Sequence, residues 1–214
     1  PFELEQVYVE GITKITALDI EYAAELGYRI KHVGVAKVVG AEVEARVHPA
    51  LLPSQALLAN VNGVANAVVV RSDAAGQTLF SGPGAGGMAT ASSVLGDVVA
   101  LWRAGESGVG GARSKTRYIE IGEVICSNYL RIPVRDKPGV FAQVANTMSE
   151  HDISIEAAIQ KEPVTGSAFV DIVIVTHAVA ESVMERAVAT LREKLGELEV
   201  SQGDISRIRI ETLE

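Results

Sequence analysis

The sequence predicts an α+β fold, in which a mixed sheet with helices on one face is followed by a second unit of order βαββαβ. Three observations carry this prediction. Short β-rich runs stand beside amphipathic helical patterns in residues 1–103. Strand and helix patterns resume over residues 128–214, and between them glycine and serine accumulate without any periodicity. We therefore expect two domains, 1–103 and 128–214, joined by a linker over 104–127.

Composition bounds the class of protein. The chain has 214 residues, 48% of them apolar, with mean hydropathy +0.23, which suits a globular protein with two modest cores. Nineteen Lys and Arg against 27 Asp and Glu give a net charge of -8. That balance disfavours nucleic acid or an anionic membrane surface as a partner.

The single cysteine and the lack of a recognisable targeting pattern favour a cytoplasmic location. Cys126 excludes an internal disulfide, and its surroundings in sequence are typical of a buried, inert thiol. No secretory segment and no apolar run of about 18 residues stands out, so we expect a cytoplasmic protein. The first residue is Pro1, and we expect the chain to be part of a longer polypeptide.

A capping box predicts the first helix. Thr16 and Asp19 have the spacing in which each side chain bonds the other's backbone amide, and the helix should end at Gly27. The positions expected on its apolar face are Ile20, Ala23, Ala24 and Gly27.

Strands and a second helix complete the first domain. The β-rich runs expected as strands are residues 32–39, 42–47, 67–71 and 78–80, with the proline-containing HPALLP between the second and third. A helix should follow, capped by Thr90 or Ser92. Its expected apolar face is Val94, Leu95, Val98, Leu101 and Trp102.

The second domain predicts four strands and two helices. Strands are expected at residues 129–134, 153–160, 168–176 and 204–212, with a turn at 163–166. The first helix should bury Val140, Phe141, Val144, Ala145 and Met148, and the second Val179, Val183, Ala187, Leu191 and Leu195.

A glycine cluster, SGPGAGG, is the clearest candidate for chemistry. Gly82, Gly84 and Gly87 match the GxGxxG fingerprint, in which glycines let the backbone approach a pyrophosphate at a helix N-terminus. The fingerprint also needs an acidic residue about 20 positions on, after a second strand. Here that count reaches Glu106 in the glycine-rich linker, so the pattern alone indicates a structural turn.

Metal and catalytic candidates are sparse. The four histidines are far apart in sequence, without HxxxH or CxxC spacing, so we predict no metal site built from neighbouring ligands. Lys31 is expected beside a helix C-terminus and Lys37 at a strand end on the surface. We assign neither a catalytic role.

Five consecutive blocks of the first domain resemble one family. VYVEGITKIT, DIEYAAELGYRIKHVGVAK, EVEARVHPALLP, ANVNGVANAVVV and GPGAGGMATASSVLGDVV resemble, in that order, the substrate and dimerisation domain of bacterial homoserine dehydrogenase. The resemblance implies an NAD(P)-dependent oxidoreductase that interconverts L-aspartate 4-semialdehyde and L-homoserine, on the route to threonine and methionine. It implies NADP or NAD as cofactor, with Gly84 and Gly86 beside it.

The same resemblance implies what this chain lacks. The family's cofactor-binding Rossmann domain, its general-acid lysine and its metal site lie upstream of the matching blocks, so no catalytic residue is assigned and the chain alone should be inactive. Ala89 stands where the family usually has proline. That departure loosens the loop without removing a donor or a charge.

The second domain resembles an ACT domain, the amino-acid-sensing module. The sequence VRDKPGVF over residues 134–141, ISIE after it, and the βαββαβ order carry the resemblance. It implies an amino-acid effector, with threonine expected, bound between two modules. The candidate effector-binding residues are Asp136, Gly139, Val140, Ile159 and Gln160.

Three functions remain open on the sequence. The first is part of a feedback-regulated homoserine dehydrogenase that acts on a small-molecule substrate as a homodimer or tetramer. The second is a non-catalytic amino-acid-sensing module whose first half serves only for dimerisation. The third is a structural dimer without a ligand.

Overall fold

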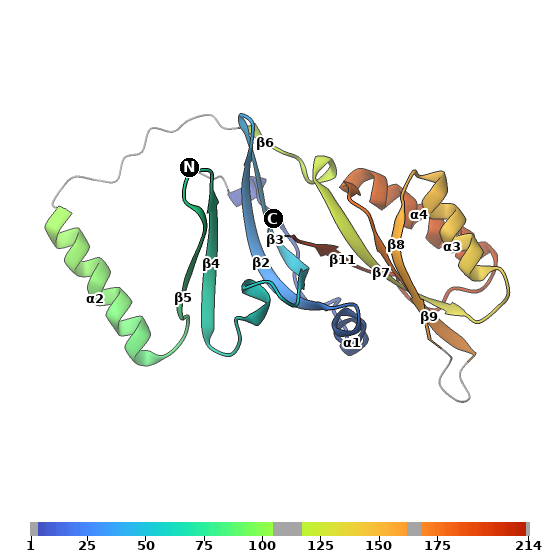
Figure 1. The fold of residues 1–214 in the computed structure, drawn as a ribbon, viewed down its shortest axis with the longest axis horizontal. Helices are drawn as coiled ribbons and strands as arrows, with labels where there is room; N and C mark the ends of the chain where they lie inside the picture. The colour runs from blue at the N-terminus through green and yellow to red at the C-terminus, as the bar shows by residue number, and fades with distance from the viewer. Residues whose placement is uncertain (1–3, 105–116, 162–167, 213–214) are drawn as a thin grey trace. The chain divides into compact units, whose positions relative to one another are not determined.

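A computed structural model describes residues 4–104, 117–161 and 168–212 (Figure 1). The turn predicted at 163–166 and residues 105–116 of the predicted linker lie outside the described residues. Contacts divide the chain into two compact units. The smaller unit holds residues 54–104, and the larger unit holds residues 4–53 together with 117–161 and 168–212. The predicted first domain therefore contributes to both units.

In the larger unit, the described residues build one nine-stranded mixed sheet. Its main path runs β1-β3-β11-β7-β9-β8, while β2 and β6 pair with β3, and β10 pairs with β7. The strands are β1 Tyr8–Val9, β2 Tyr28–Val39, β3 Glu42–Pro53, β6 Arg117–Tyr118, β7 Ile125–Arg135, β8 Ile155–Gln160, β9 Phe169–Thr176, β10 Val179–Ala180 and β11 Ser206–Ile210. Two short 3-10 helices, η1 Leu4–Gln6 and η3 Ile121–Glu123, accompany them.

The β2–β3 hairpin confirms two predicted strands and lengthens both. Twelve residue pairs run from Tyr28↔Pro53 to Val39↔Glu42, around a two-residue turn in which Gly40 has φ 63. The stretch HPALLP, which the prolines mark as irregular, belongs to β3. Its residues from His48 to Leu52 are buried, so burial on both faces decides the structure here.

Helix α1, Ala17–Glu25, confirms the capping box and corrects the predicted face. The Thr16 hydroxyl accepts from the Asp19 amide, and the Asp19 carboxylate accepts from the Thr16 amide. Ile20, however, is 57% exposed, while Asp19 is 0% exposed. The predicted face is rotated because a buried ion pair, described below, holds the acidic residue inward.

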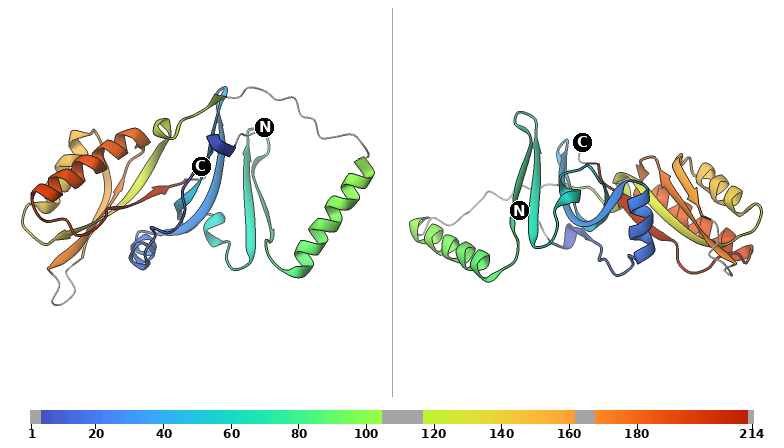
Figure 2. Two further views of the ribbon diagram at one scale, coloured as in Figure 1. Left: turned by 180° about the vertical axis from the view of Figure 1, so that it is seen from behind. Right: turned by 60° about the horizontal axis from the view of Figure 1, so that its bottom comes forward.

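Strands β7, β8, β9 and β11 and two helices form the predicted βαββαβ module. Its helices are α3, Val140–Glu150, and α4, Glu181–Glu197, and they lie together on one face of the module's strands (Figures 1 and 2). Val144 and Met148 of α3 are buried against Leu191 and Leu195 of α4, as predicted. Phe141 differs, since it is half exposed and Thr147 takes the inward position.

The opposite face of the same strands packs against α1. Tyr22 and Ala23 of the helix join a second core with side chains from β3, β7, β9 and β11. The other buried members of this core are Leu51, Tyr129, Val173, Val175, Ile208 and Ile210. Both faces of the module's sheet are therefore covered, one of them by an element of the predicted first domain.

The smaller unit is a hairpin and a helix with little buried surface. Strands β4, Ala65–Ser72, and β5, Gly76–Pro83, pair in antiparallel register after η2, Leu58–Asn60. Helix α2, Gly87–Ala104, begins three residues before Thr90, so Thr90 and Ser92 lie inside the helix and neither caps it.

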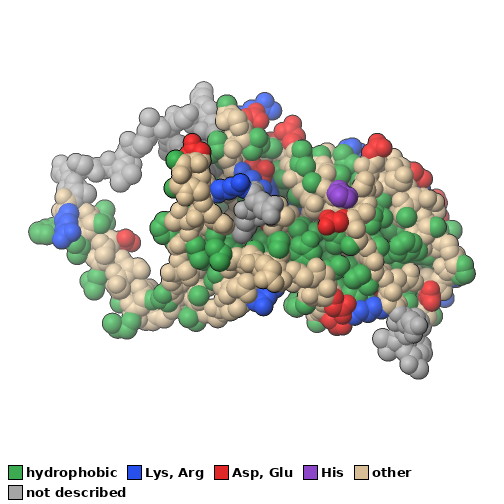
Figure 3. Space-filling model, in the orientation of Figure 1, with side chains coloured by type: hydrophobic (Ala, Val, Ile, Leu, Met, Phe, Trp, Pro, Cys, Tyr) green, Lys and Arg blue, Asp and Glu red, His purple; other side chains and the backbone are tan. Residues whose placement is uncertain are grey.

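Helix α2 and the hairpin expose apolar side chains, which stand out along the helix in Figure 3. The exposed ones on the helix are Met88, Val94, Leu95, Val98, Val99, Leu101 and Trp102, the last of them 82% exposed. The predicted apolar face exists, but nothing in the described residues buries it. No helix in the described part of the chain is both long and apolar enough to cross a membrane.

Shortening a core leucine of α4 should destabilise the larger unit. Leu191 is 0% exposed and Leu198, at the end of the same helix, is 49% exposed. We expect Leu191→Ala to lower the free energy of unfolding by about 2–5 kcal/mol, because it leaves a cavity and removes apolar burial. Leu198→Ala should cost well under about 1 kcal/mol. Denaturant unfolding followed by circular dichroism measures both, and equal losses would contradict the packing described here.

Candidate functional site

The glycine cluster forms an exposed loop between β5 and α2. The strand ends at Pro83 and the helix begins at Gly87. The backbone amide of Gly84 donates to the carbonyl oxygen of Val64 at 2.7 Å, which ties the loop to the residue before β4. Residues 81–88 are exposed. The loop thus presents its backbone on the surface, at the N-terminus of a helix of 18 residues.

The two candidate glycines have different reasons to be glycine. Gly86 has φ 122, a conformation that other residues rarely adopt, and a Cβ there would meet nothing within 4 Å. A Cβ on Gly84 would instead overlap the side chain of Asn66. Gly84 is therefore required by packing inside its own unit, whereas Gly86 leaves open space into which a ligand can approach.

The loop before α3 is the second candidate site. Gly139 is the N-cap of α3, with φ 89, and no atom lies within 4 Å of where its Cβ would be. Because no side chain caps α3, its first-turn amides have no side-chain partner there. Val140, the first helical residue, is buried and anchors the turn in the core.

The structure brings some of the other effector candidates to this loop. Gln160 at the end of β8 donates from Nε2 to Oδ1 of Asp136 at 3.5 Å. Asp136 does not cap α3, and Pro138 precedes the helix. Ile159 points to the opposite face of β8, where it packs against the α1 core. Of the candidate effector-binding residues, Asp136, Gly139 and Gln160 are therefore the ones that lie together at this loop.

Buried charge clusters, which sequence reasoning missed, join residues 4–53 to the βαββαβ module. In the first cluster, Arg131 of β7 donates from Nε to Asp19 at 2.8 Å and from Nη1 to Asp171 at 3.1 Å. Burial alone would raise the pKa of Asp19, but hydrogen bonds from Arg131 and Thr16 outweigh it and lower that pKa. Asp19 is therefore held as a carboxylate.

A second cluster surrounds Glu181 at the start of α4. Arg209 of β11 donates from Nη2 to Glu181 at 2.6 Å and from Nη1 to Glu10 at 2.6 Å. Arg207 also pairs with Glu181, at 2.5 Å. The Cys126 thiol donates to Glu181 at 3.1 Å, and burial raises its pKa to about 12. The cysteine is buried, as predicted.

A third cluster surrounds Glu211, just after β11. Arg46 donates from Nη2 to Glu211 at 2.5 Å and from Nε to His48 Nε2 at 2.9 Å. Since His48 Nε2 accepts that bond, its Nδ1 carries the proton that bonds the Pro49 carbonyl oxygen at 2.9 Å. Lys37 completes the cluster at 3.4 Å from Glu211, so it is ion-paired and not a bare surface residue.

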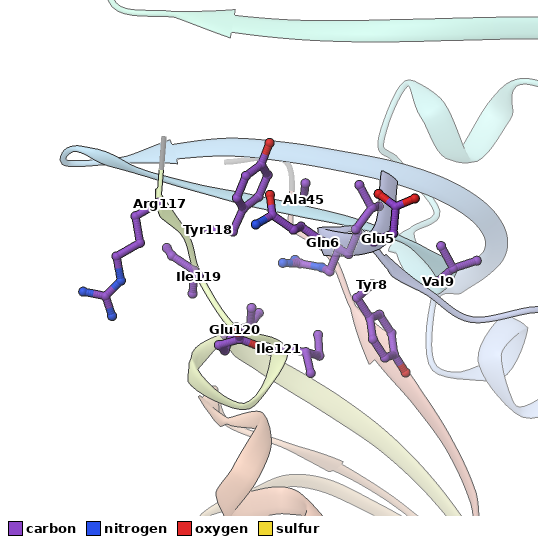
Figure 4. A pocket seen from close by; sticks show the side chains of 13 residues that line it. Glu5, Gln6, Tyr8, Val9, Ala45, Arg117, Tyr118, Ile119, Glu120 and Ile121 are labelled. Atoms are coloured by element: carbon purple, nitrogen blue, oxygen red, sulfur yellow. The ribbon is translucent and has the colours of Figure 1, made fainter. Parts of the chain in front are cut away.

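Two of the clefts in the larger unit are lined in part by residues 4–53. One, of about 650 Å³, lies between residues 5–9 and residues 117–124 (Figure 4), and Ala45 and Arg46 of β3 also line it. The other, of about 850 Å³, lies between residues 8–18 and the module. Its charged lining residues are Lys14, Arg131, Arg192, Arg207, Arg209, Glu10, Asp171, Glu185 and Asp204. The cations and acids nearly balance, so the second cleft favours no ion of either sign.

No group of three or more His, Cys, Asp or Glu side chains in residues 4–104, 117–161 and 168–212 is arranged to hold a metal ion. Three of the four histidines make hydrogen bonds of other kinds. His48 is buried in the Glu211 cluster, His151 bonds the Thr190 hydroxyl at 3.1 Å, and His32 bonds the Glu10 carbonyl oxygen at 3.1 Å.

Comparison with known proteins matches both halves of the chain. The family model described as homoserine dehydrogenase matches residues 1–99, and the ACT domain model matches residues 128–196. Homoserine dehydrogenase of Pseudomonas aeruginosa is 44% identical over all of this chain, which covers 50% of that protein. The Bacillus subtilis enzyme is 37% identical over 98% of this chain and 48% of its own length.

Solved structures agree. A homoserine dehydrogenase from Thiobacillus denitrificans superposes over 100% of this chain with a TM-score of 0.85 and 37% identity, and the chain covers 49% of it. The chain belongs to the homoserine dehydrogenase family. It spans about half the length of the curated relatives that it matches.

Membership of the homoserine dehydrogenase family confirms both resemblances drawn from the sequence. The βαββαβ module is an ACT domain, and the mixed α+β architecture is that of the family. The S. aureus homoserine dehydrogenase, at 23% identity and a TM-score of 0.59, shares the fold. The charge clusters join residues that are distant in sequence, so no sequence motif revealed them; Asp19 and Arg131, for example, lie 112 positions apart.

The Glu211 cluster should make stability depend on pH. Burial would raise the pKa of Glu211, but the hydrogen bond and positive charge of Arg46, together with the charge of Lys37, lower that pKa from 4.5 to about 2. A depressed pKa contributes stability that is present above pH 4.5 and lost as the pH falls towards 2. The whole contribution is roughly 3 kcal/mol, since one pKa unit is worth about 1.4 kcal/mol.

We expect Glu211→Gln to remove much of this acid-side slope and to lower stability at neutral pH, because the buried Arg46 loses one of its two carboxylate partners, Glu211 and Glu44. Unfolding by urea across pH 2–7 measures the slope. Glu193→Gln, at an exposed position of α4, is the matched control and should leave it unchanged. An unaltered slope in the Glu211 variant would contradict the assignment.

Proposed function

We propose that this chain is part of an enzyme that interconverts L-aspartate 4-semialdehyde and L-homoserine by hydride transfer to or from NADP or NAD. The observation that supports it most directly is the exposed glycine loop, within the family match, whose backbone opens at Gly86 and runs into the N-terminus of α2. We assign residues 1–103 the substrate and dimerisation role and residues 128–214 the regulatory role, joined over 104–127.

The residues present fit one side of a nicotinamide cofactor. When bound, the cofactor supplies or accepts the hydride. Gly86 lets a flat or anionic group approach without a side chain in the way, and the first-turn amides of α2 attract negative charge. Gly84 holds the loop to Val64 and so positions Gly86. The chain's part is to bind and orient, and we assign it no proton donor.

The exposed apolar faces of α2 and of the β4–β5 hairpin support a larger assembly. Side chains such as Phe80 and Trp102 are exposed, and monomeric proteins seldom leave so large an apolar area open to water. We propose that the half of the homoserine dehydrogenases that this chain does not match covers part of these faces, and that a second copy covers another part in a homodimer.

The first test is enzymatic. We expect the 214-residue chain alone to show no homoserine-dependent reduction of NADP or NAD, because it carries no assigned acid and only one side of the cleft. Fusing to it the half of the P. aeruginosa relative that it does not match should produce that activity. NADPH absorbance measures both. An active isolated chain would refute the first expectation, and an inactive but folded fusion would refute the enzymatic proposal.

We further propose that the ACT domain binds an amino acid, with threonine as the expected effector. The carboxylate would meet the amides at the start of α3 beside Gly139, where no side chain intervenes, and the ammonium group would meet Asp136. Gln160, already bonded to Asp136, orders that carboxylate. In a dimer or tetramer a second ACT domain would complete the site.

Titration calorimetry tests this site on the isolated chain. We expect threonine to bind, and Asp136→Asn to weaken binding about tenfold or more, because a charge-assisted hydrogen bond to the ammonium is lost. Asp204→Asn, an equal change of charge at an exposed position of the same module, should bind as the parent does. No heat with threonine, isoleucine or methionine would count against the site. Binding together with an inactive fusion would favour a non-catalytic sensor.

A further inference from the structure

Helix α1 lies where the two matched regions meet. It belongs to the segment that matches homoserine dehydrogenase, yet Tyr22 and Ala23 are buried against strands of the ACT domain. The partly buried Ala157 and Ile159 of β8 pack against the same core. A shift of these strands would therefore press on α1, because a close-packed interior leaves no slack to absorb it.

The N-terminal end of α1 is fixed by a buried ion pair. Arg131 Nε lies 2.8 Å from Asp19, whose side chain is 0% exposed, and Arg131 Nη2 reaches the Thr16 hydroxyl at 3.2 Å. The same guanidinium holds Asp171 of β9 at 3.1 Å. Breaking such a pair leaves a charge buried without its partner, so the contact resists gradual loosening.

The C-terminal end of α1 is held by Lys161, directly after β8. Its Nζ lies 2.5 Å from Glu25 and 3.5 Å from Glu21, and 5.0 Å from the centre of the Tyr22 ring. Lys161, Glu21 and Glu25 are exposed, so these ion pairs are weaker than the Arg131 pair and sensitive to salt. The helix is thus held at both ends by cations of the ACT domain.

Both cations connect to the candidate effector residues. Lys161 follows Gln160, and Gln160 pairs with Ile172, the neighbour of Asp171. β8 is also the last strand on the path of the sheet and, in the described residues, pairs with β9 alone. An edge strand with one partner is easier to displace than a central one. The strand that carries Gln160 is therefore easier to displace than β7, β9 and β11, the other strands of the module.

We propose that α1 transmits the state of the ACT domain to the dehydrogenase half, through Arg131 at its first turn and Lys161 at its last. A displacement of α1 would pass next to the long strand β2, because the chain leads from α1 through Gly27, with φ 82, directly into that strand. This inference rests on the proposed function, in which the ACT domain is the sensor and the first half belongs to the enzyme.

Amide hydrogen exchange on the 214-residue chain tests the connection without any ligand. Coupling is reciprocal, so loosening α1 must be felt at β8. We expect Asp19→Asn to accelerate exchange several-fold in α1 and at residues 158–161 and 169–171, and to leave the buried amides of α3 and α4 unchanged. Lys161→Ala should accelerate exchange at the end of α1, by less.

Val188→Ala is the control for simple destabilisation, because Val188 lies in the α3–α4 core and not in the α1 core. It should accelerate exchange in α3 and α4 and spare α1. If Asp19→Asn instead accelerates all amides alike, or only those of α1, the proposed connection is wrong.

A second arm adds threonine. In the parent chain, we expect slower exchange both at residues 158–161 and in α1, and in Asp19→Asn only at residues 158–161. Slowing of α1 in both would overturn the role of the Arg131 pair. If threonine changes no amide, the proposed effector fails, while the ligand-free comparison still decides whether α1 and β8 are coupled.

Discussion

The parallel pairing of β11 with β3 is the contact on which the larger unit depends. It is short, with Arg209 opposite Ala50 and Ile210 opposite Leu51, and one further backbone bond of 3.0 Å from the Glu211 amide to the Leu51 carbonyl oxygen. Through it, strands β1, β2, β3 and β6 continue the sheet of the ACT domain. Without this pairing the two sets of strands would each expose an open edge.

Buried ion pairs beside this short pairing determine which strand β11 pairs with. The Glu211 and Glu181 clusters lie beside it, and Arg46 and Arg209 reach acids far away along the chain. Buried ion pairs add little net stability over apolar contacts, but a wrong register would leave several charges unpaired in the interior. They therefore select one neighbour for β11. The buried ion pairs also make the β3–β11 pairing stiff, since each pair is either formed or broken, without intermediate states.

The sequence predicts the order of elements far better than their partners. The capping box at Thr16, the hairpin around Gly40 and the βαββαβ order all follow from local patterns, and the structure confirms them. Local patterns fail to predict which side chains are buried where a contact with a residue distant in sequence determines it. Ile20 is apolar and reads as inward, but Arg131 pulls Asp19 in and turns Ile20 outward.

The candidate sites divide in the same way. Gly86 and Gly139 could be found from sequence, because both have a positive φ, which glycine adopts more easily than other residues do. The hydrogen bond between Asp136 and Gln160 within one module is not predicted from the sequence, since the resemblance implies only that both residues line an effector bound between two modules. The charge clusters could not be found, because their members stand on strands and helices without any motif. The sequence predicts that Gly84 lies beside a ligand, and the structure shows a second reason for glycine there, since a Cβ would overlap Asn66.

The wide separation of β3 and β11 along the chain has a consequence for biosynthesis. Arg46 and Glu211 are 165 positions apart, and the whole of residues 54–104 is made between them. On the ribosome, β3 must wait for β11 with its buried edge uncovered, so the nascent polypeptide passes through a stage open to misassociation. Chaperone protection during that interval would matter more for this sheet than for the hairpin and helix translated in between.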